Sequence, residues 1–315
     1  MISIVIRAKN EHRFLGDVLR LILAQDDTEE REIVVIDSGS TDGTKELART
    51  FPVRLCEIPA DKFTFGYALN YGANQARGRI IVYLSAHCTP TTHSWLRGLV
   101  EPLRRDQQLK ATYGRQEPRK GVNPFEEQGL RAAFPTNGSQ PTFALFSNAN
   151  CAIWRSVLEK HPFDEQITFA EDLVWRLQFD ARDIQYVPMA SVYHSHPLAL
   201  KYWAHRFELD GIATVRMFRE YGIINPYTRQ SDDLTTTVRD FLEGCRQHIK
   251  FFLFHGYYRF LPAIPFFEAT RTFFFSRGLR KGRTEGRYVL HEAGATNAAM
   301  ASKRTGEAPR PLQPK

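Results

Sequence analysis

The N-terminal part of the chain alternates short apolar runs with stretches of helical periodicity. Leu15, Val18, Leu19 and Ile22, for example, recur at the spacing of one helix face. Parallel strands joined by helices are the simplest arrangement for such an alternation, so the pattern predicts an α/β fold. The apolar runs predict strands over residues 3–7, 32–36, 53–56 and 80–84. Helices are predicted from an N-cap at Ser40 or Thr41 through residue 48, and over 70–77 and 92–105.

Regularity falls away after a further predicted strand around Thr112. The segment 121–142 contains several Gly, Pro and Asn residues and is typical of a substrate loop or lid. Order returns with the segment 146–153 and with a helix that carries residues 171–177. Two short strands are predicted next, near Tyr186 and Val192. We therefore expect a first domain over residues 1–210.

From residue 211 the pattern becomes helical, aromatic and basic. Val238, Leu242, Ile249 and their apolar neighbours recur at i, i+3, i+4 and i+7, which predicts an amphipathic helix. Charged residues and prolines interrupt the aromatic stretch 251–275, so no run of about 20 apolar residues exists to cross a bilayer. Residues 211–292 are expected either to lie on a membrane surface or to pack as a helical subdomain. The tail 293–315 is predicted to be disordered.

The composition is that of a globular protein. A chain of 315 residues with 43% hydrophobic residues can bury one large or two modest cores. The first residues run straight into a predicted strand without the features of an export signal. Four widely spaced cysteines with no Cys-X-X-Cys pair fit free thiols in a reducing compartment. We therefore expect a cytoplasmic location.

The net charge of +7 is unevenly distributed. A short basic segment is opposed within itself only by Glu285, and this asymmetry predicts an anionic partner. A membrane surface suits the preceding Phe-rich stretch better than nucleic acid, for which the segment has no known reading module. A solvated basic face is the alternative. The segment's basic residues are Arg271, Arg277, Arg280, Lys281, Arg283 and Arg287.

A polar segment, Asp37-Ser-Gly-Ser-Thr-Asp-Gly43, follows the second predicted strand directly. A carboxylate at the end of a strand can accept a hydrogen bond from a nucleobase N–H or a ribose hydroxyl. The glycines allow the backbone to turn closely around a ligand. On this chemistry alone, the segment is equally well explained as a tight turn with a helix cap at Ser40 or Thr41.

Several motifs agree in order and spacing with one enzyme family. They are Ile4-Val-Ile-Arg-Ala-Lys-Asn-Glu11, Val35-Ile-Asp-Ser-Gly-Ser-Thr-Asp-Gly-Thr44, and Phe65-Gly-Tyr-Ala-Leu-Asn-Tyr-Gly72 with Ala76-Arg-Gly78. Together they resemble family 2 glycosyltransferases of the GT-A fold, and in particular a rhamnosyltransferase-like branch. The resemblance covers about residues 1–210. It implies a Rossmann-like mixed sheet flanked by helices, with a C-terminal helical region.

The resemblance also implies a nucleotide-sugar site. At the position of the family's Asp-X-Asp metal motif this chain has Ser85-Ala86-His87, and Ser38 stands where the family has a second Asp. Arg115 is expected to reach the diphosphate and Gln116 a sugar hydroxyl, with an exposed loop pair as the alternative. The full set of implied donor-binding residues is Ala8, Asn10, Glu11, Asp37, Ser38, Asn70, Ser85, Ala86, Arg115, Asn148 and Asn150.

An acidic motif follows, in which Phe163-Asp-Glu165 precedes Phe169-Ala-Glu-Asp172. It resembles the family motif that supplies the catalytic base of inverting enzymes. An acceptor hydroxyl must lose its proton as it attacks the anomeric carbon, and a positioned carboxylate contributes roughly 10² to 10⁴ in rate. The resemblance implies that Asp172 is this base and that Glu171 positions it or binds the acceptor. Acids placed favourably at a helix N-terminus are the alternative.

Departure of a nucleoside diphosphate requires positive charge near the leaving group. His87, His194 and His196 are the candidate metal ligands. Neutral imidazole suits Mn²⁺ or Zn²⁺, whereas Mg²⁺ prefers oxygen ligands. Three alternatives stay open: metal-free catalysis by a protonated His87 or by Arg7, a structural zinc site that includes Cys88, and histidines without a ligand role.

Taken together, these features predict an inverting hexosyltransferase of polysaccharide or cell-envelope biosynthesis. A nucleotide-sugar donor and a glycan or lipid-linked glycan acceptor are the expected partners, on the inner face of the cell membrane, and nucleic acid is not. The expected cofactor is a divalent metal, Mn or Mg, with metal-independent catalysis left open. A nucleotide-sugar-binding protein without turnover is the competing hypothesis, against which the retained Glu171-Asp172 pair argues.

Overall fold

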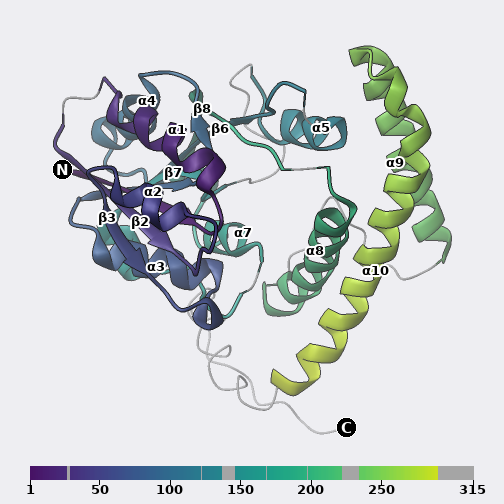
Figure 1. Ribbon diagram of the computed structural model, residues 1–315. Helices are drawn as coiled ribbons and strands as arrows, with labels where there is room; N and C mark the ends of the chain where they lie inside the picture. Colours follow the sequence, from purple (N-terminus) through teal and green to yellow (C-terminus); the bar gives the residue numbers. More distant parts are fainter. Residues whose placement is uncertain are drawn as a thin grey trace, which may run out of the picture.

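A mixed sheet organises the N-terminal two thirds of the protein, and helices cover both of its faces (Figure 1). The computed structural model describes residues 1–26, 29–121, 123–136, 146–167, 169–196, 198–221 and 234–289. Within these residues the sheet has eight strands in the order β3-β2-β1-β4-β7-β6-β8-β5. The strands are β1 Ile2–Ala8, β2 Arg31–Asp37, β3 Arg54–Glu57, β4 Ile80–Ser85, β5 Thr89–Pro90, β6 Ala111–Glu117, β7 Asn150–Trp154 and β8 Ile184–Tyr193.

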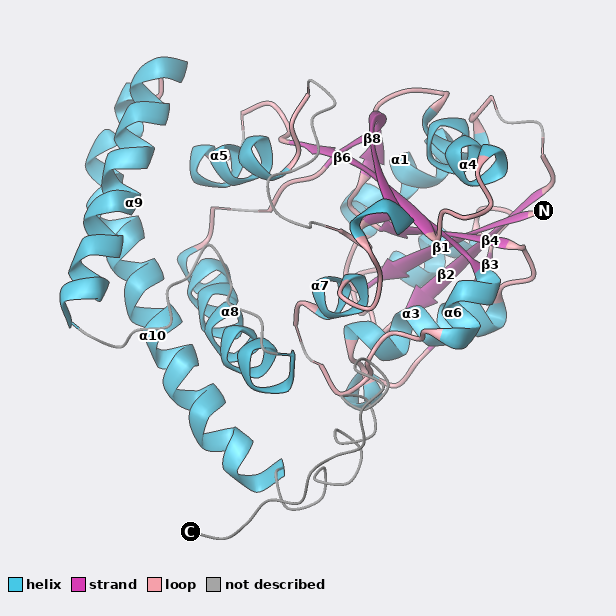
Figure 2. Ribbon diagram, turned by 180° about the vertical axis from the view of Figure 1, so that it is seen from behind, coloured by secondary structure: helices cyan, strands magenta, loops and turns pink. Residues whose placement is uncertain are grey.

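Short helices connect these strands, as the alternating pattern predicted. The sheet, its flanking helices and the helical C-terminal region confirm the predicted α/β class (Figure 2). The connecting α-helices are α1 His12–Leu23, α2 Thr44–Arg49, α3 Phe65–Gln75, α4 Trp95–Arg105, α5 Pro124–Ala133, α6 Arg155–Lys160 and α7 Glu171–Arg176. Two 3₁₀ turns, η1 Ala60–Lys62 and η2 Ala181–Asp183, complete this part.

The first four strands in sequence run parallel, and their register brings the strand ends level. Ala8 of β1 lies opposite Asp37 of β2, while Arg7 lies opposite Ser85 of β4. The polar residues that follow β1, β2 and β4 therefore meet at one edge of the sheet. This is the edge at which open α/β sheets bind ligands.

Alternate residues of β1 enter two separate cores, because successive side chains of a strand point to opposite faces. Ile4 and Ile6 pack with the apolar faces of α1 and α4. Val5 packs on the other face, with Ile36 and with residues of α3. The central strands β1 and β4 are buried on both sides, which explains why their sequences are mostly apolar.

The second half of the sheet departs from the predictions in two places. One continuous strand, β8, replaces the two short strands expected near Tyr186 and Val192, and it pairs with β6 through an irregular register between Gly114 and Gln116. The segment 121–142 contains α5, so the expectation of a wholly irregular stretch was wrong. The N-cap of α2 is Gly43, with φ of 88°, and not Ser40 or Thr41.

Three long helices follow the sheet: α8 Leu200–Tyr221, α9 Leu234–His255 and α10 Ile264–Val289, with the 3₁₀ turn η3 Tyr258–Ala263 before α10. The helix α8 runs through residue 210, the expected domain boundary. It crosses α10 closely at Gly211 and Gly278, where an added Cβ on Gly278 would meet the carbonyl oxygen of Glu208 at 2.0 Å. The predicted amphipathic helix is confirmed as α9. The predicted tail, 293–315, lies outside the described residues.

The basic segment on α10 is partly neutralised by acids elsewhere in the chain. Arg277 and Lys281 form ion pairs with Glu208 of α8, and Arg271 pairs with Glu268. These acids lie outside the segment, and they add to Glu285, the acid within it. Among the described residues, no helix is long and apolar enough to cross a membrane.

Candidate functional site

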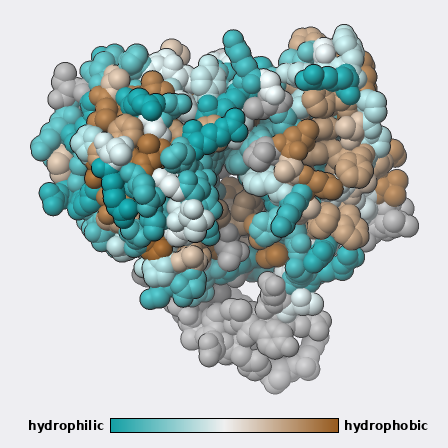
Figure 3. All heavy atoms as spheres, in the orientation of Figure 1, coloured by the Kyte–Doolittle hydropathy of each residue, from teal (hydrophilic) through white to brown (hydrophobic). Residues whose placement is uncertain are grey.

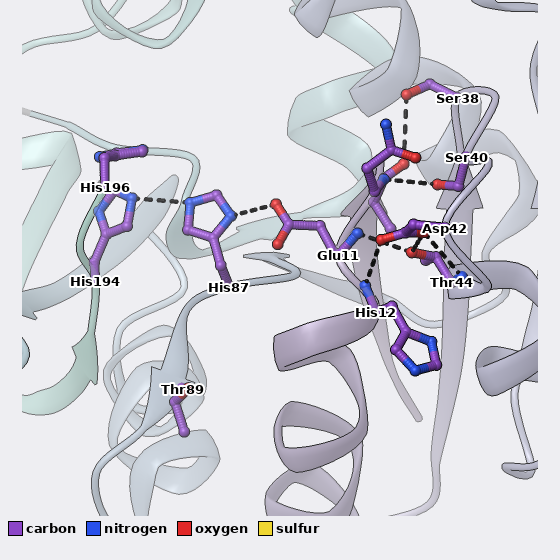
Figure 4. Close-up of polar contacts among 12 residues, drawn as sticks. Glu11, His12, Ser38, Ser40, Asp42, Thr44, His87, Thr89, His194 and His196 are labelled. Carbon is purple, nitrogen blue, oxygen red and sulfur yellow. Dashed lines mark hydrogen bonds and ion pairs between the residues drawn. The ribbon is translucent and has the colours of Figure 1, made fainter. Parts of the chain in front are cut away.

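The loops after β1 and β2 are joined by backbone-to-side-chain hydrogen bonds. The Asn10 N–H donates to Ser40 Oγ at 2.8 Å, and the Thr41 N–H donates to Asn10 Oδ1 at 2.8 Å. The Glu11 N–H donates to Thr44 Oγ1 at 2.8 Å (Figure 4). Asn10 adopts a left-handed backbone conformation with φ of 56°. These bonds fix the start of α1 against the loop that follows β2.

Asp37 is fully buried at the end of β2. Its Oδ1 accepts from the N–H groups of Gly39 and Ser40, at 3.0 and 2.9 Å, which holds the turn closed. Gly39 has φ of 89°, a conformation that few other residues adopt at low cost. The second carboxylate oxygen, Oδ2, is buried and has no protein partner. It is therefore the free acceptor at this strand end. The neighbouring Ser38 N–H donates to the Ala8 carbonyl at 3.1 Å.

The Ser85-Ala86-His87 segment makes a tight turn directly after β4. The Ala86 N–H donates to the Arg7 carbonyl at 3.1 Å, and the Cys88 N–H donates to the Ser85 carbonyl at 2.8 Å. Ala86 and Cys88 are fully buried, whereas the His87 side chain stays partly exposed. The turn therefore projects His87 alone from this edge of the sheet.

Three imidazole rings converge at this point, although His87 is more than a hundred residues from the other two in the sequence. Ligand atoms of His87, His194 and His196 all lie within 4.8 Å of one another. The Nε2 atoms of His87 and His194 are 3.1 Å apart (Figure 4). The structure thus brings together the three residues that the sequence suggested as metal ligands.

Each ring uses its other nitrogen to contact a neighbouring oxygen. His87 Nδ1 lies 2.7 Å from Glu11 Oε1, and His194 Nδ1 lies 2.5 Å from Gln116 Oε1. His196 Nδ1 lies 2.6 Å from Glu126 Oε1 on α5. Since these oxygens can only accept, all three Nδ1 atoms carry the proton when the rings are neutral. The Nε2 lone pairs then face one another.

Two of the rings are held in the neutral form. Burial lowers the pKa of His194 well below its usual value, and the neighbouring His87 and His196 rings lower it further. Burial also lowers the pKa of His196, although the Glu126 carboxylate partly opposes this shift. Neutral imidazole is the form that coordinates metal ions.

This set of donors fits a divalent metal ion that accepts nitrogen ligands. Metal-binding histidines commonly donate their second N–H to a carboxylate or another oxygen, which fixes the ring orientation. All three rings already have such a partner here. Two lone pairs 3.1 Å apart repel unless a cation or a shared proton lies between them. The donor set suits Mn²⁺ or Zn²⁺ better than Mg²⁺.

Cys88 does not join this cluster. Its side chain is fully buried, and the group of ligand atoms that lie within 4.8 Å of one another contains His87, His194 and His196 and not Cys88. The alternative of a structural zinc site with Cys88 as a ligand therefore has no support from the geometry.

A second chain of hydrogen bonds leads from β1 to the acidic motif. Arg7 Nη2 donates to Asn148 Oδ1 at 2.8 Å, and Asn148 Nδ2 donates to Glu171 Oε1 at 2.6 Å. Ala170, directly before Glu171, has a left-handed backbone with φ of 65°. Asn10 and Ala170 are the two non-glycine residues with positive φ in the described part of the chain, and both lie in the candidate site. Such backbone strain clusters at functional sites.

The two acids of the motif differ in their surroundings. Glu171 is 5% exposed and is held by Asn148. Asp172 is less buried by accessible surface, and its Oδ1 accepts from the Leu173 N–H at 2.8 Å. Desolvation and, next, the adjacent Glu171 carboxylate raise the pKa of Asp172 to about 7. A carboxylate with such a pKa is suited to accept a proton near neutral pH.

The sequence did not single out Arg206, on α8, which lies at the same site. Its guanidinium lies over the Phe169 ring at 5.2 Å and is hydrogen-bonded to Tyr202, whose ring stacks on His196 with centroids 5.0 Å apart. Arg206 is also one of the groups that lower the pKa of His194, after burial and the other histidines. Arg206 therefore lies between the histidine cluster and the acidic motif, with the Asp210 carboxylate as its main counter-charge.

Other predicted donor-site residues are engaged within the protein. Asn150 is fully buried and bonds to Trp95 Nε1 and to the carbonyls of Arg115 and Ala190. The amide of Asn70 bonds to the backbone of Phe163 and to Glu165. Arg115 pairs with Glu117 at 3.3 Å. Gln116 donates to Ser147 Oγ in addition to facing His194.

Glu126 is another site residue that the sequence did not reveal. It holds His196 twice, since its Oε2 also accepts from the His196 N–H at 2.8 Å. A local signal was present, because Asn123-Pro124 is a typical helix start and Glu126 and Glu127 fall in the first turn. The surrounding Gly and Asn residues suggested a loop instead.

Two curated proteins match parts of this chain in sequence. Over 100 residues the chain is 32% identical to the glycosyltransferase AglE of Haloferax volcanii, covering 30% of this chain and 33% of that protein. Over 181 residues it is 28% identical to the O-antigen chain rhamnosyltransferase WbaN of Salmonella anatum, covering 52% and 56%. The chain thus spans about a third and about half of the lengths of these curated relatives.

Solved structures share the fold at low sequence identity. The mannosyltransferase PcManGT from Pyrobaculum calidifontis, in complex with GDP-Man and Mn²⁺, aligns with a TM-score of 0.61 and 18% identity, over 89% of this chain and 86% of that one. Glucosyl-3-phosphoglycerate synthase from Mycobacterium tuberculosis, in complex with Mn²⁺, UDP-glucose and glycerol 3-phosphate, aligns with a TM-score of 0.53 and 20% identity, over 72% and 82%.

The family model described as "Glycosyl transferase family 2" matches residues 3–161, which is half of the chain. This match confirms the family resemblance that the motifs suggested, and one of the curated relatives, WbaN, is named a rhamnosyltransferase. The chain belongs to glycosyl transferase family 2.

Proposed function

We propose that this glycosyltransferase is an inverting enzyme that moves a sugar from a nucleotide-sugar donor to a hydroxyl of a surface-glycan or lipid-linked acceptor. The proposal rests on one observation: Arg7 connects the three-histidine cluster to an acid at a single sheet edge. Its carbonyl accepts from Ala86, next to His87, and its guanidinium reaches Asn148, which holds Glu171. The leaving group and the acceptor hydroxyl need these two kinds of group.

The nucleotide is proposed to lie along the ends of β1 and β2. The buried Asp37 Oδ2 has no protein partner and can accept from a base N–H or a ribose hydroxyl. The loop of residues 8–11 forms the opposite wall, held by the bonds of Asn10 and Glu11 to the loop after β2. These assignments use the free acceptor and the fixed backbone of the site.

The diphosphate is proposed to lie at the histidine cluster. A divalent ion held by His87, His194 and His196 would neutralise the negative charge of the leaving diphosphate. The protein adds its own positive charge through the guanidinium of Arg206, with Arg7 near the other end of the site. Glu11, Gln116 and Glu126 keep the three rings oriented.

Asp172 is proposed to be the general base. Its carboxylate takes the proton of the acceptor hydroxyl while the acceptor oxygen forms a bond to the anomeric carbon. The bond between that carbon and the diphosphate oxygen breaks, and the diphosphate leaves with the electron pair. Attack from the face opposite the leaving group inverts the anomeric centre. Glu171 is held by Asn148 and positions the start of α7, which carries Asp172.

A panel of nucleotide sugars tests this function. Donor hydrolysis and transfer to lipid-linked and free glycans would be measured with Mn²⁺, with Mg²⁺ and with chelator. We expect at least one donor to be hydrolysed slowly, faster with Mn²⁺ than with Mg²⁺, and to be transferred with inversion. Donor binding without hydrolysis or transfer under any condition would instead support a binding protein without turnover.

We also propose that the outer side of α9 lies on an anionic membrane, on its cytoplasmic face. Leu242 and Phe254 are 58% and 85% exposed, and Val238, Ile249 and Leu253 also face outward. Figure 3 shows hydrophobic side chains gathered over α9 and α10. Exposed basic residues such as Lys250 flank this side, as expected for an interfacial helix. The free cysteines of the chain agree with a reducing compartment.

Vesicle sedimentation tests the membrane proposal. Leu242→Glu with Ile249→Glu should release the protein from vesicles that contain anionic lipid, because both changes place charge on the apolar side of α9. The matched control is Leu23→Glu, which changes an exposed leucine on α1, an element distant from α9 in the sequence. Equal sedimentation of wild type and the α9 variant would overturn this proposal.

A further inference from the structure

One short helix contacts both the histidine cluster and the C-terminal helices. Four consecutive residues of α5, residues 125–128, each have a different partner. Glu126 holds His196 through its ring and its backbone N–H. The other three residues contact α9, η3 and α10, and α5 lies beside α9 in both ribbon views (Figures 1 and 2).

The first of these contacts is aromatic. Phe125 stacks on Phe267 of α10 with ring centroids 4.0 Å apart and an interplanar angle of 16°. Phe252 of α9 also packs against the Phe125 ring, with ring centroids 4.9 Å apart. Ile264 completes this small core. Phe125 is 5% exposed, so the packing covers it almost completely. The start of α5 is therefore inserted into the C-terminal helical region.

The other two contacts are hydrogen bonds. The Tyr257 hydroxyl, just before η3, donates to Glu127 Oε2 at 2.6 Å. His248 Nδ1 of α9 lies 2.6 Å from Gln128 Oε1. His248 is itself held by Glu268 of α10, at 2.9 Å from its Nε2. Glu268 is 1% exposed, so this link ends in the buried interior of the helical region.

We propose that the C-terminal helices set the metal affinity of the three-histidine site by fixing α5, and that Glu126 is the positioning residue through which they act. The inference rests on the proposed metal role of the histidine cluster. Glu126 and Glu127 are neighbours on one helical turn, so a shift of α5 that loosens the Tyr257 contact also moves the carboxylate that orients His196. Loss of an outer partner of a metal ligand commonly lowers metal affinity by about 10- to 100-fold.

Mn²⁺ binding to the full-length protein tests the proposal, with equilibrium dialysis and metal analysis as the readout. Glu126→Ala should raise the Mn²⁺ Kd by about 10- to 100-fold. Glu126→Gln should recover most of the affinity, because its amide oxygen can still accept from His196 Nδ1. If Glu126 had a purely structural role, the two variants would have the same Mn²⁺ Kd. Equal Kd values would therefore overturn the positioning role.

The contact between α5 and the C-terminal helices is tested with substitutions at residues that do not touch the three histidines. Tyr257→Phe with Gln128→Ala removes both hydrogen bonds and should raise the Mn²⁺ Kd by about 3- to 10-fold. Tyr258→Phe, at the exposed neighbouring tyrosine, is the matched control and should leave the Kd unchanged. Thermal unfolding of each variant verifies that it is folded, and the single variants replace the double one if it is not.

The outcomes separate the two proposals. Wild-type Mn²⁺ affinity in the Tyr257 and Gln128 variants would overturn the coupling while leaving the proposed function intact. A wild-type protein that binds no divalent ion would overturn the metal role and the coupling together. Normal Mn²⁺ binding with weakened binding in these variants, but no transfer to any acceptor, would support the coupling and count against the proposed reaction.

Discussion

The loops after β1 and β2 and the segments around β7 and β8 meet at one edge of the sheet, but different bonds hold them. The first pair is fixed mainly by backbone N–H groups and short side chains, as in the bonds of Asn10 and Asp37. The segments around β7 and β8 depend on pairs of side chains. Arg7 and Asn148 are 141 residues apart in sequence, and His196 and Glu126 are 70 residues apart. The nucleotide half is thus built by bonds between backbone and side chain across about 30 residues of sequence, and the half around the reacting groups by pairs of side chains that are farther apart.

This difference predicts how each half responds to mutation. Each loop bond of the first half needs only one correctly placed side chain, because its other partner is a backbone N–H. Side-chain relays lose their geometry when one member is removed. We therefore expect single substitutions in the second half to change catalysis or metal binding strongly while the fold persists.

The largest effect is expected at Asp172. Asp172→Asn removes the proposed proton acceptor and should lower transfer by roughly 10² to 10⁴ in rate, with donor affinity nearly unchanged. Steady-state transfer and donor titration would measure the two quantities. Asp164→Asn, at the earlier acid of the same motif, provides the matched control. Full transfer by Asp172→Asn would remove Asp172 from the mechanism.

The next effect is expected at the histidine cluster. His194→Ala removes a proposed ligand and should weaken Mn²⁺ binding by at least the roughly 10- to 100-fold that follows loss of an outer partner. Direct metal analysis after dialysis would measure this change. His205→Ala is the control, since His205 is exposed on α8. Unchanged Mn²⁺ content in His194→Ala would show that the ion binds elsewhere.

A pH profile should sharpen the assignment of the base. Burial and the Glu171 carboxylate raise the pKa of Asp172 to about 7, so the group is protonated and inactive below that pH and becomes a base above it. We expect kcat/KM to rise with pH through about 7, with a slope near tenfold per pH unit on the acid side. The measurement needs saturating Mn²⁺ at each pH. A flat profile from pH 5 to 8 would exclude Asp172 as the titrating base.

The smallest effect should separate two buried asparagines. Asn150→Ala leaves Trp95 Nε1 and two backbone carbonyls without partners, so we expect a loss of about 1 to 3 kcal/mol of unfolding free energy. Because Asn150 contacts neither loop of the nucleotide half, donor affinity should be retained. Asn148→Ala should instead lower transfer, since Asn148 joins Arg7 to Glu171. Urea unfolding and transfer assays on both variants test this contrast, and identical behaviour would contradict it.

The parts of the fold that the sequence predicted well are those with strong local patterns. The strands β1, β2 and β4 each carry a run of apolar residues, and α1 shows a clear helical period. The errors occurred where local signals conflict. Pro188 lies within the continuous strand β8. Because proline within an apolar run usually marks an edge strand or a break, the sequence predicted two strands here.

The sequence predicted which types of residue form the site, but not which side chains contact one another there. The motifs identified Asp37, His87 and Asp172 as residues with useful chemistry at strand and helix ends. No local pattern could show that Glu126 faces His196 or that Arg206 lies over Phe169, because these contacts depend on how distant segments pack. The same reason explains Asn150, whose amide is satisfied entirely by partners from other elements.

The contacts of α5 also restrict changes of length within the helix itself. One residue of an α-helix corresponds to a rotation of about 100°. A single insertion between Pro124 and Phe125 would therefore turn residues 125–128 away from all four of their partners at once. Among related sequences, substitutions within this surface helix should be common where a partner changes with them, whereas insertions and deletions should collect on either side of it.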